Sequence, residues 1–344
     1  MLLTIIVPLY NAEKHLERCL NSLINQQLNA VDYEIILIND GSTDDGKLIA
    51  EKFIKKHSNI VLYNQNNCGL GASRNRGIEL AKGTYVYFID SDDYLAHNTL
   101  HIILNYSIKY DLDLLGFSSI QTSRLDLNIC KSNNEFLNIE VLKGVDFLVE
   151  HKHLDLGACW YIIKRDYLIN SRYKFVEGKF FEDVVFTYYI FLHAERLLYL
   201  PIDAHRYVKV LESITNNDNQ THLKKVIEDY TSLIYRMNQL IIEISNNNES
   251  SYNVIANNIK FKRSVNIYFM FYKMIRSNIS IRNINKILRG FKVIDAYPLT
   301  NFIGDQYHQR KFKISVYVFN NKYLFYLLLY PLRLLNKYKL IKLP

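Results

Sequence analysis

The sequence predicts an α/β protein in which a mostly parallel sheet is flanked by helices and followed by a helical C-terminal extension. In about the first hundred residues, short apolar runs alternate with stretches of helical periodicity, as in strands buried on both faces and joined by crossover helices. Polar residues follow each apolar run directly. Beyond residue 220 helical periodicity dominates, and no repeat of fixed period is present.

Four apolar runs are the expected strands of the N-terminal part: Leu2–Leu9, Tyr33–Ile38, Ile60–Tyr63 and Tyr85–Ile89. Between them, apolar residues recur at helical spacing over 16–24 and 48–54, and a further helical turn is expected at 78–81. Asn11 is placed to cap the first helix. Strand and helix therefore alternate, which favours a parallel sheet whose functional residues lie at the carboxyl ends of its strands.

After a less regular region, an apolar run returns at Cys159–Ile163 and an apolar helix is expected at Val184–Leu192. The Asn-rich residues 216–220 resemble a linker, so we expect one domain over 1–215 and a second over 216–344. The expected helices of the second domain are Val226–Ile244, Ile255–Met274 and Ile281–Phe291.

Composition excludes several classes of protein. Hydrophobic residues make up 49% of the chain and charged residues 22%, which is enough apolar material for a large core and excludes an intrinsically disordered chain. The four cysteines form no C-x-x-C pair, which indicates a reducing, cytoplasmic environment. The N-terminal apolar run lacks the features of a signal peptide. The longest apolar run, Tyr323–Leu332, has ten residues, whereas a spanning helix needs roughly 20.

Charge is distributed unevenly between the two predicted domains. Residues 1–215 carry 22 basic and 27 acidic side chains, a net charge of −5, whereas residues 216–344 carry 20 and 7, a net charge of +13. The C-terminal part is therefore expected to face an anionic partner, either phospholipid headgroups or nucleic acid.

The apolar and aromatic run Tyr323–Tyr330 favours the membrane as that partner. Lys322 and Arg333 bracket the run, and further basic residues follow it: Lys337, Lys339 and Lys342. An apolar run beside basic side chains is typical of a segment at a membrane surface. We interpret a similar run at Ile267–Phe271 as core between helices. The expected location is thus the inner face of the cell membrane, attached peripherally, with no nucleic-acid partner.

A possible metal site follows the fourth expected strand, at Asp90-Ser91-Asp92-Asp93. Three carboxylates within four residues repel one another, and Mg²⁺ or Mn²⁺ would remove that repulsion while binding substrate phosphates. The alternative is that Asp93 only caps the next helix, which leaves the other two carboxylates unexplained. We favour the metal site.

Other candidate residues are expected near this site. Asp40, at the end of the second strand, can accept hydrogen bonds from a base or ribose, and Arg74 lies near the expected diphosphate. Gly69-Leu70-Gly71 is not a dinucleotide fingerprint, because Arg74 occupies the third glycine position. Glu182-Asp183 precedes an apolar helix, where a carboxylate acts either as a general base or as a helix cap; the residues alone leave the two interpretations equal.

Four ordered motifs resemble those of family 2 glycosyltransferases, which have the GT-A fold, a Rossmann-like α/β fold. The motifs are Ile6–Asn11, Asn39–Asp44, Asn67–Gly77 and Asp90–Asp93. Trp160 and Glu182-Asp183 resemble the acceptor-side segment and the catalytic acidic pair of that family. The resemblance covers residues 1 to about 215 and implies a nucleotide-sugar half at about 1–93 and an acceptor half at about 94–215.

The resemblance also implies a role for each matching residue. Nucleotide-sugar binding would involve Pro8, Tyr10, Asp40, Arg74 and Asp90. Asp92 and Asp93 would hold the metal, Asp183 would deprotonate the acceptor hydroxyl, and Trp160 and Glu182 would lie on the acceptor side. The implied reaction is an inverting transfer of a sugar from a nucleotide-sugar, expected to be a UDP-sugar, to a hydroxyl of a lipid-linked glycan in cell-surface polysaccharide synthesis.

One segment departs from the family pattern. Many relatives have Tyr-Arg followed five residues later by Ser, whereas here Tyr207-Val208 precedes Ser213, so Arg206 or Lys209 would have to replace the missing arginine. Two other functions stay open: a non-catalytic basic protein that docks to anionic membrane or nucleic acid, and a nucleotidyltransferase using the same metal site. The joint presence of Asp92 and Asp183 argues against the first, because binding alone needs no base.

Overall fold

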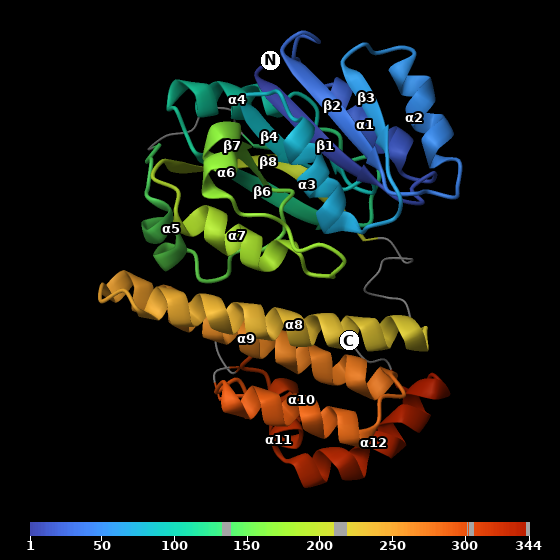
Figure 1. The fold of residues 1–344 in the computed structure, drawn as a ribbon, viewed down its shortest axis with the longest axis vertical. Coiled ribbons are helices and arrows are strands. Elements are labelled where there is room, and N and C mark those ends of the chain that lie inside the picture. The colour runs from blue at the N-terminus through green and yellow to red at the C-terminus, as the bar shows by residue number, and fades with distance from the viewer. Residues whose placement is uncertain (133–138, 210–218, 301, 303–305, 342–344) are drawn as a thin grey trace. The chain divides into compact units, whose positions relative to one another are not determined.

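The computed structural model describes residues 1–132, 139–209, 219–300, 302 and 306–341 (Figure 1). The chain divides into two compact units, Met1–Leu211 and Glu212–Pro344. The predicted domain boundary at residue 215 falls outside the described residues. The two units are considered separately below.

An eight-stranded sheet forms the centre of the first unit, with the strand order β3-β2-β1-β4-β7-β6-β8-β5. The four strands expected from the apolar runs are confirmed as β1 (Leu3–Leu9), β2 (Tyr33–Asn39), β3 (Ile60–Asn64) and β4 (Tyr85–Phe88). They are mutually parallel, with β1 between β2 and β4. Their carboxyl ends therefore lie along one edge of the sheet.

The other half of the sheet is mixed. Its strands are β5 (Tyr94–Leu95), β6 (Leu114–Thr122), β7 (Tyr161–Lys164) and β8 (Leu197–Val208). Strand β7 is antiparallel to both β4 and β6, β8 is parallel to β6, and the short β5 is antiparallel to β8. The predicted mostly parallel α/β fold is thus confirmed, and the antiparallel strands are confined to the half where the sequence pattern is irregular.

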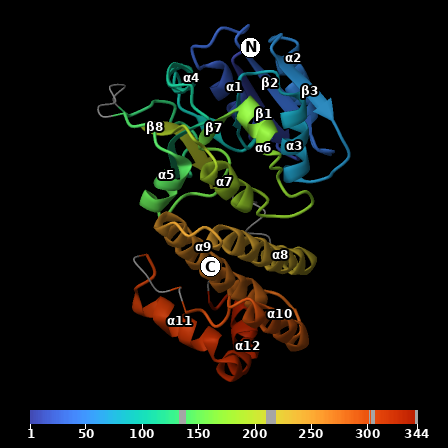
Figure 2. The same cartoon turned by 60° about the vertical axis from the view of Figure 1, so that its left-hand side comes forward.

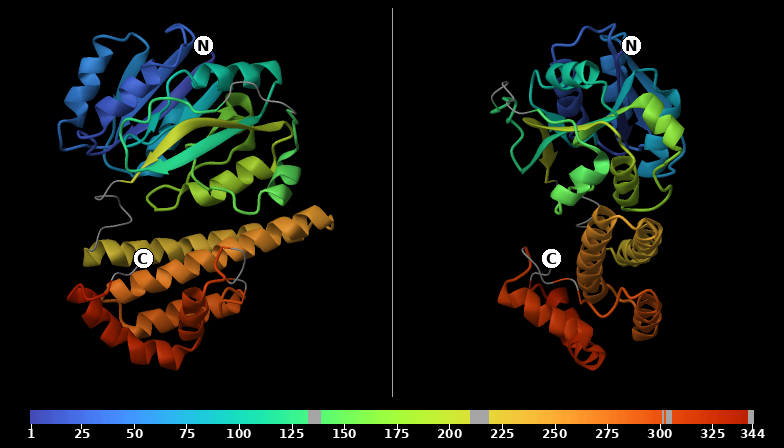
Figure 3. Two further views of the ribbon diagram at one scale, coloured as in Figure 1. Left: turned by 180° about the vertical axis from the view of Figure 1, so that it is seen from behind. Right: turned by 90° about the vertical axis from the view of Figure 1, so that its left-hand side faces the viewer.

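Helices cover both faces of this sheet. They are α1 (Leu16–Ile24), α2 (Gly46–Ile54), α3 (Leu70–Leu80), α4 (Leu100–Lys109), α5 (Gly144–Glu150), α6 (Arg165–Ser171) and α7 (Asp183–Leu192). Figure 1 shows α3, α6 and α7 on one face, and Figure 3 shows α1 and α4 on the other. Alternate residues of β1 from Leu3 to Leu9 share a core cluster with α1 and α4, whereas Ile6 faces α3. A Cβ on Gly77 of α3 would lie 2.4 Å from Ile6, so this close packing requires glycine.

Two local expectations are wrong. Helix α3 begins at Leu70, well before the turn expected at 78–81, because its buried side chains are glycines and polar residues that carry no apolar periodicity. Asn11 does not cap α1, which begins after His15. The Asn11 backbone has a positive φ of 48°, and its Oδ1 accepts a hydrogen bond from the Thr43 N–H at 2.8 Å. Asn11 therefore ties the loop after β1 to the loop after β2.

The second unit is helical, as expected: α8 (Gln220–Ser245), α9 (Ser250–Arg276), α10 (Ile281–Val293), α11 (Arg310–Asn320) and α12 (Lys322–Lys337) (Figure 2). Phe271 of α9 stacks on Phe319 at 4.5 Å and meets Phe325 edge-on at 5.0 Å. The interpretation of Ile267–Phe271 as core is confirmed, because this part of α9 lies within the unit's aromatic core.

Helix α12 contains the run Tyr323–Leu332, and only part of that run is core. Phe325 and Leu329 are fully buried, whereas Tyr323, Leu327 and Tyr330 are exposed. The Arg333 guanidinium donates hydrogen bonds to the Met274 and Ile279 carbonyls, so this cation is used within the unit. Among the described residues, no helix combines the length and the apolar composition that crossing a bilayer requires.

Candidate active site

The candidate site lies where the parallel strands end. Tyr10 follows β1, Asp40 follows β2, and the acidic segment from Asp90 follows β4. Register brings these ends together, because Leu9 of β1 lies opposite Asn39 of β2, and Asn39 opposite Asn64 of β3. An amide hydrogen bond of 2.8 Å joins the Asn39 and Asn64 side chains across the same edge.

The acidic segment forms a compact cluster. Asp90, Asp92 and Asp93 each offer a carboxylate oxygen within 4.8 Å of the others. Burial, with the negative charges of Asp93 and Asp90, raises the pKa of Asp92 to about 7. A divalent cation would offset this repulsion, so the donor set suits a hard metal such as Mg²⁺ or Mn²⁺.

Asp93 differs from its two neighbours because both of its oxygens have partners within the protein. The His205 Nε2 lies 3.0 Å from Oδ2, and the Val208 N–H donates to Oδ1 at 2.8 Å. The next helix begins only at Leu100, so Asp93 does not cap it. The carboxylate instead anchors β8 beneath the acidic segment. These contacts favour Asp90 and Asp92 over Asp93 as the ligands of a cation.

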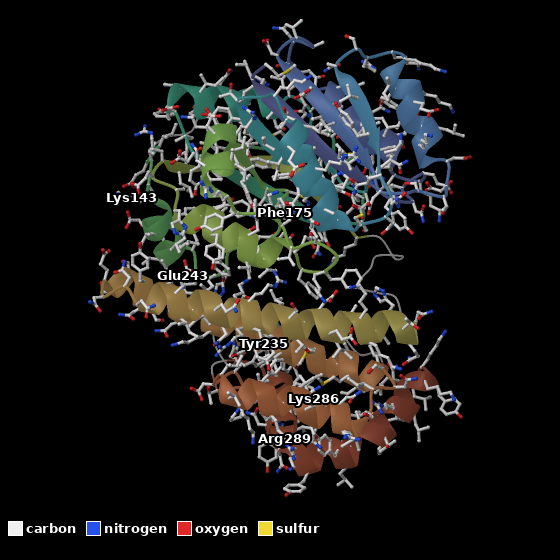
Figure 4. All side chains as sticks on the ribbon, viewed as in Figure 1. Lys143, Phe175, Tyr235, Glu243, Lys286 and Arg289 are labelled. Carbon is white, nitrogen blue, oxygen red and sulfur yellow. The ribbon has the colours of Figure 1, made fainter. Side chains whose placement is uncertain are left out.

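Arg74 links the two halves of the site. Its guanidinium, with a side chain only 1% exposed, donates to Asp90 Oδ1 at 2.7 Å and to Glu182 Oε1. It also lies 5.2 Å from the centre of the Phe175 ring, which Figure 4 labels. The geometry does not favour the expected direct contact of Arg74 with a diphosphate. The guanidinium group is buried, and its charge is already shared by two carboxylates.

Glu182 and Asp183 lie at the N-terminus of α7, where the alternatives were a helix cap and a general base. Glu182 is the N-cap residue by position, yet its side chain makes no capping hydrogen bond and binds Arg74 instead. Burial and the adjacent Glu182 raise the pKa of Asp183, and the Arg74 charge partly offsets this. A partly buried carboxyl of raised pKa beside a buried cation is suited to accept a proton.

The segment before α7 is held against α3 by backbone and side-chain contacts. Asn75 of α3 donates to the Phe175 carbonyl and accepts from the Phe175 N–H, both at 2.9 Å. A Cβ on Gly71 would lie 2.5 Å from the Val176 carbonyl oxygen, so glycine permits this approach. Glu182 and Asp183 are thus positioned by α3.

Asp40 holds the loop that precedes α3. Its Oδ1 accepts from Gln65 Nε2 and the Cys68 N–H, and its Oδ2 accepts from the Gly69 N–H, all at 2.8 Å. These bonds fix the loop in which Gly69 adopts φ +92° before α3 begins. A carboxylate has about four acceptor positions, so these three bonds leave one position on Oδ2 of this buried side chain.

The remaining predicted residues lie in different surroundings. Tyr10 is exposed beyond the end of β1, whereas Pro8 is buried inside that strand. Trp160 is buried, donates its Nε1–H to the Asp155 carbonyl at 3.2 Å and packs 5.2 Å from Phe191 of α7. Trp160 therefore supports the helix that begins with Asp183, and its ring does not form an open acceptor surface.

Sequence reasoning missed or misassigned several residues around the site. Arg18 of α1 donates to the Asp92 carbonyl and lies 5.3 Å from the Tyr94 ring, so it holds the acidic segment in place. His205 of β8 is a second such residue, because its Nε2 lies 3.0 Å from Asp93 Oδ2. Arg206 does not replace the missing family arginine, because its buried guanidinium is paired with Asp203 at 2.6 Å. No local pattern marks the roles of Arg18 and His205, since their partners in the acidic segment lie 74 and 112 residues away in sequence. Ser213 lies outside the described residues.

Comparison with known proteins agrees with this architecture. Residues 4–168 match the family model described as glycosyl transferase family 2. The chain is 29% identical over 247 residues to the uncharacterized glycosyltransferase YibD of Escherichia coli K12, covering 69% of this chain and 71% of YibD. It is 32% identical over 219 residues to the uncharacterized glycosyltransferase EpsJ of Bacillus subtilis 168, covering 62% and 63% of the two chains.

A third relative is the poly(ribitol-phosphate) β-glucosyltransferase of Bacillus spizizenii, 33% identical over 202 residues that make up 57% of this chain but 30% of the relative. Solved structures share the fold as well, among them the following two. Residues 1–349 of Staphylococcus aureus TarS with UDP-GlcNAc align over 94% of this chain and 88% of theirs, with a TM-score of 0.63 and 18% identity. The mannosyltransferase PcManGT of Pyrobaculum calidifontis, with GDP-Man and Mn²⁺, aligns over 92% and 86%, with a TM-score of 0.52 and 13% identity. Residues 4–168 therefore match the family 2 glycosyltransferases, the chain has the GT-A fold, and its glycosyltransferase relatives support transferase activity.

Proposed function

We propose that this chain is an inverting, metal-dependent glycosyltransferase that moves a sugar from a UDP-sugar to a hydroxyl of a lipid-linked glycan in cell-surface polysaccharide synthesis. The observation that carries the proposal is the buried Arg74, which binds Asp90 on the donor side and Glu182 on the acceptor side. The donor choice is supported by the UDP-GlcNAc complex of TarS, and a surface-glycan acceptor by the poly(ribitol-phosphate) relative.

On the donor side, Asp90 and Asp92 would hold Mn²⁺ or Mg²⁺. When bound, the ion supplies positive charge to the diphosphate leaving group. The Asp92 pKa of about 7 supports this assignment, because burial and the neighbouring Asp93 and Asp90 disfavour the charged form of Asp92 unless a cation is bound. The neighbouring mannosyltransferase structure, described with GDP-Man and Mn²⁺, is consistent with such a site. Tyr10 and the free acceptor position of Asp40 Oδ2 would contact the nucleoside.

On the acceptor side, Asp183 would take the proton of the attacking hydroxyl. The hydroxyl oxygen then forms a bond to the anomeric carbon on the face opposite the diphosphate, while the bond from that carbon to the diphosphate oxygen breaks, so the configuration inverts. Arg74 stays out of the proton transfer. It neutralises Glu182 beside the base and holds Asp90 in place, which makes it a positioning residue.

We further propose that the enzyme works at the inner face of the cell membrane, attached peripherally through its basic second unit. This location would give the active site access to a lipid-linked acceptor. The non-catalytic alternative, a basic protein that binds membrane or nucleic acid, is disfavoured because it leaves the Arg74-bridged carboxylates without a role.

A donor screen tests the proposed reaction. Purified protein is incubated with UDP-, GDP- and dTDP-sugars, with Mn²⁺ or with EDTA, and released nucleoside diphosphate is measured. We expect donor-dependent release of UDP that requires the metal. In a parallel incubation with a nucleoside triphosphate and a sugar 1-phosphate, release of pyrophosphate would identify a nucleotidyltransferase. Release of neither product in either incubation would support the non-catalytic alternative.

A further inference from the structure

Three basic side chains share one face of α10 in the second unit. Arg282, Lys286 and Arg289 are spaced by four and three residues, which places them on the same side of a helix. All three are exposed, and in the part of the chain that the structure describes none forms an ion pair with a carboxylate. Like charges held together at this spacing repel one another, so an anion between them would be stabilising.

These side chains line an open pocket of about 770 Å³, together with Ile281, Asn283 and Asn285. Figure 4 labels Lys286 and Arg289 on this helix. Two guanidinium groups, an ammonium group and two side-chain amides give the pocket many N–H donors and no carboxylate. Such a donor set suits the oxygens of a phosphate group.

Helix α12 lies beside this pocket. The Tyr326 hydroxyl donates to Asn285 Oδ1 at 2.8 Å. Burial raises the pKa of Tyr326 and the positive charge of Arg289 partly offsets it, which also indicates that the two side chains are close. Arg333, about two turns further along α12, binds carbonyls at the end of α9 and just before α10. Helix α12 is therefore held to α10 by Tyr326 and to the segment before α10 by Arg333.

An apolar stripe, defined as Tyr323, Leu327, Tyr330 and Leu334, runs along the outer face of α12. Tyr323 is 79% exposed and Leu327 72% exposed, and their spacing continues to Leu334 along one side of the helix. Tyr326, three residues after Tyr323 and four before Tyr330, flanks this stripe. The stripe thus borders the basic pocket on the side where Tyr326 meets Asn285.

We propose that the α10 pocket binds the phosphate headgroup of an anionic phospholipid while the apolar stripe of α12 enters the headgroup region of the same membrane. Charge complementarity selects the headgroup, and tyrosine with leucine is the composition that favours the membrane–water interface. A soluble phosphate polymer would use the pocket but gain nothing from the stripe. This inference rests on the proposed membrane attachment and assigns it to a defined site.

The site also changes how that attachment must be tested. Deleting residues 323–344 would remove Phe325 and Leu329 from the core and would leave Phe271 and Phe319 unpacked. A truncated chain that fails to bind would then be uninformative about the membrane. Substitutions at exposed positions avoid this problem.

The test is vesicle co-flotation of the full chain across increasing salt, with neutral phosphatidylcholine vesicles and with vesicles containing phosphatidylglycerol. The pocket variant combines Arg282→Gln, Lys286→Gln and Arg289→Gln. A matched control removes the same charge from exposed positions of the first unit: Lys52→Gln, Lys55→Gln and Lys56→Gln. A stripe variant combines Tyr323→Ser, Leu327→Ser and Tyr330→Ser. Retained UDP binding shows that each variant has a folded first unit, and far-UV circular dichroism reports on the helices of the second.

We expect the parent and the control to float with anionic vesicles only. Because each basic residue near an anionic surface contributes on the order of 1 kcal/mol before screening, the pocket variant should partition roughly 10- to 100-fold less, with a weaker dependence on salt. The stripe variant should also lose partition. If the pocket variant floats as well as the parent, the pocket is not the headgroup site, although the membrane attachment stands. If the parent does not float, the proposed attachment and the proposed site are both wrong. Transferase activity on a soluble acceptor is measured separately and tests the catalytic proposal by itself. If the stripe variant binds anionic vesicles as tightly as the parent does, and both bind polyphosphate with that same affinity, the pocket is a general polyanion site instead.

Discussion

Replacing Arg74 by methionine should destabilise the first unit strongly, and mainly through Glu182. Methionine fills much of the same space but leaves Glu182, 5% exposed, as a buried carboxylate without its cation. Removing one partner of a buried ion pair costs about 3–5 kcal/mol. The loss at Asp90 is smaller, because its side chain is 31% exposed and water can replace part of the interaction. The expected total is therefore about 3–5 kcal/mol.

A double-mutant cycle identifies the source of this loss. Glu182→Gln removes the negative charge that Arg74 neutralises, so the double variant with Arg74→Met should be more stable than the sum of the two single losses by about 1–3 kcal/mol. Urea unfolding followed by fluorescence measures this in the first unit alone, because Trp160 is the single tryptophan of the chain. A loss below about 1 kcal/mol for Arg74→Met, or additive losses in the cycle, would refute the argument that Arg74 neutralises Glu182.

Three further predictions concern the acids of the site. Asp92→Asn should abolish turnover and weaken UDP binding in the presence of Mn²⁺, as measured by calorimetry with and without the metal; equal, metal-independent binding in parent and variant would exclude Asp92 as a ligand. The folded-state pKa of Asp92 is raised to about 7, so in the metal-free protein its contribution to stability is present at acid pH and is lost as the pH rises through 7. Added Mn²⁺ should therefore raise the urea midpoint more at pH 8 than at pH 5. The Asp92→Asn variant should not show that difference. Asp183→Asn should keep UDP binding and lose about 10²–10⁴-fold in transfer rate, whereas a residue that only supports the helix start would leave the rate almost unchanged and cost about 1 kcal/mol of stability.

The first half of the sheet is the part of the fold that the sequence predicts best. Strands β1, β2 and β4 are apolar at nearly every position because both faces are covered, so their pattern is visible without knowledge of their neighbours. The polar residues after each strand follow from the same reasoning, since parallel strands end at one edge. Asp40, Asp90 and Asp92 were predicted there on that basis.

The contacts of individual side chains could not be predicted as their positions were. Arg74, whose expected place near a phosphate stays a prediction, binds two carboxylates, one of them 108 residues away in sequence. Asp93, whose expected role as a metal ligand also stays a prediction, has its His205 partner 112 residues away. Helix α3 was not predicted over its first two turns because it buries glycines and polar groups, with Gly77 against the Ile6 side chain and Gly71 against the Val176 backbone.

Local pattern by itself determined the alternating strands and helices of the first unit, the acidic segment at a strand end, and the helical, basic character of the second unit, because each of these depends on the side chains within a few residues of one another. Only the tertiary structure decided which carboxylates share Arg74 and which face of α12 is buried. Glu182 meets Arg74 because Asn75 and Gly71 bring the segment before α7 against α3, and Phe325 is core because Phe271 and Phe319 meet it there. Which side of an apolar helix is buried depends on the helices that pack against it, and the partner of a buried charge comes from a segment far away in sequence. Neither can be read from the residues within a few positions.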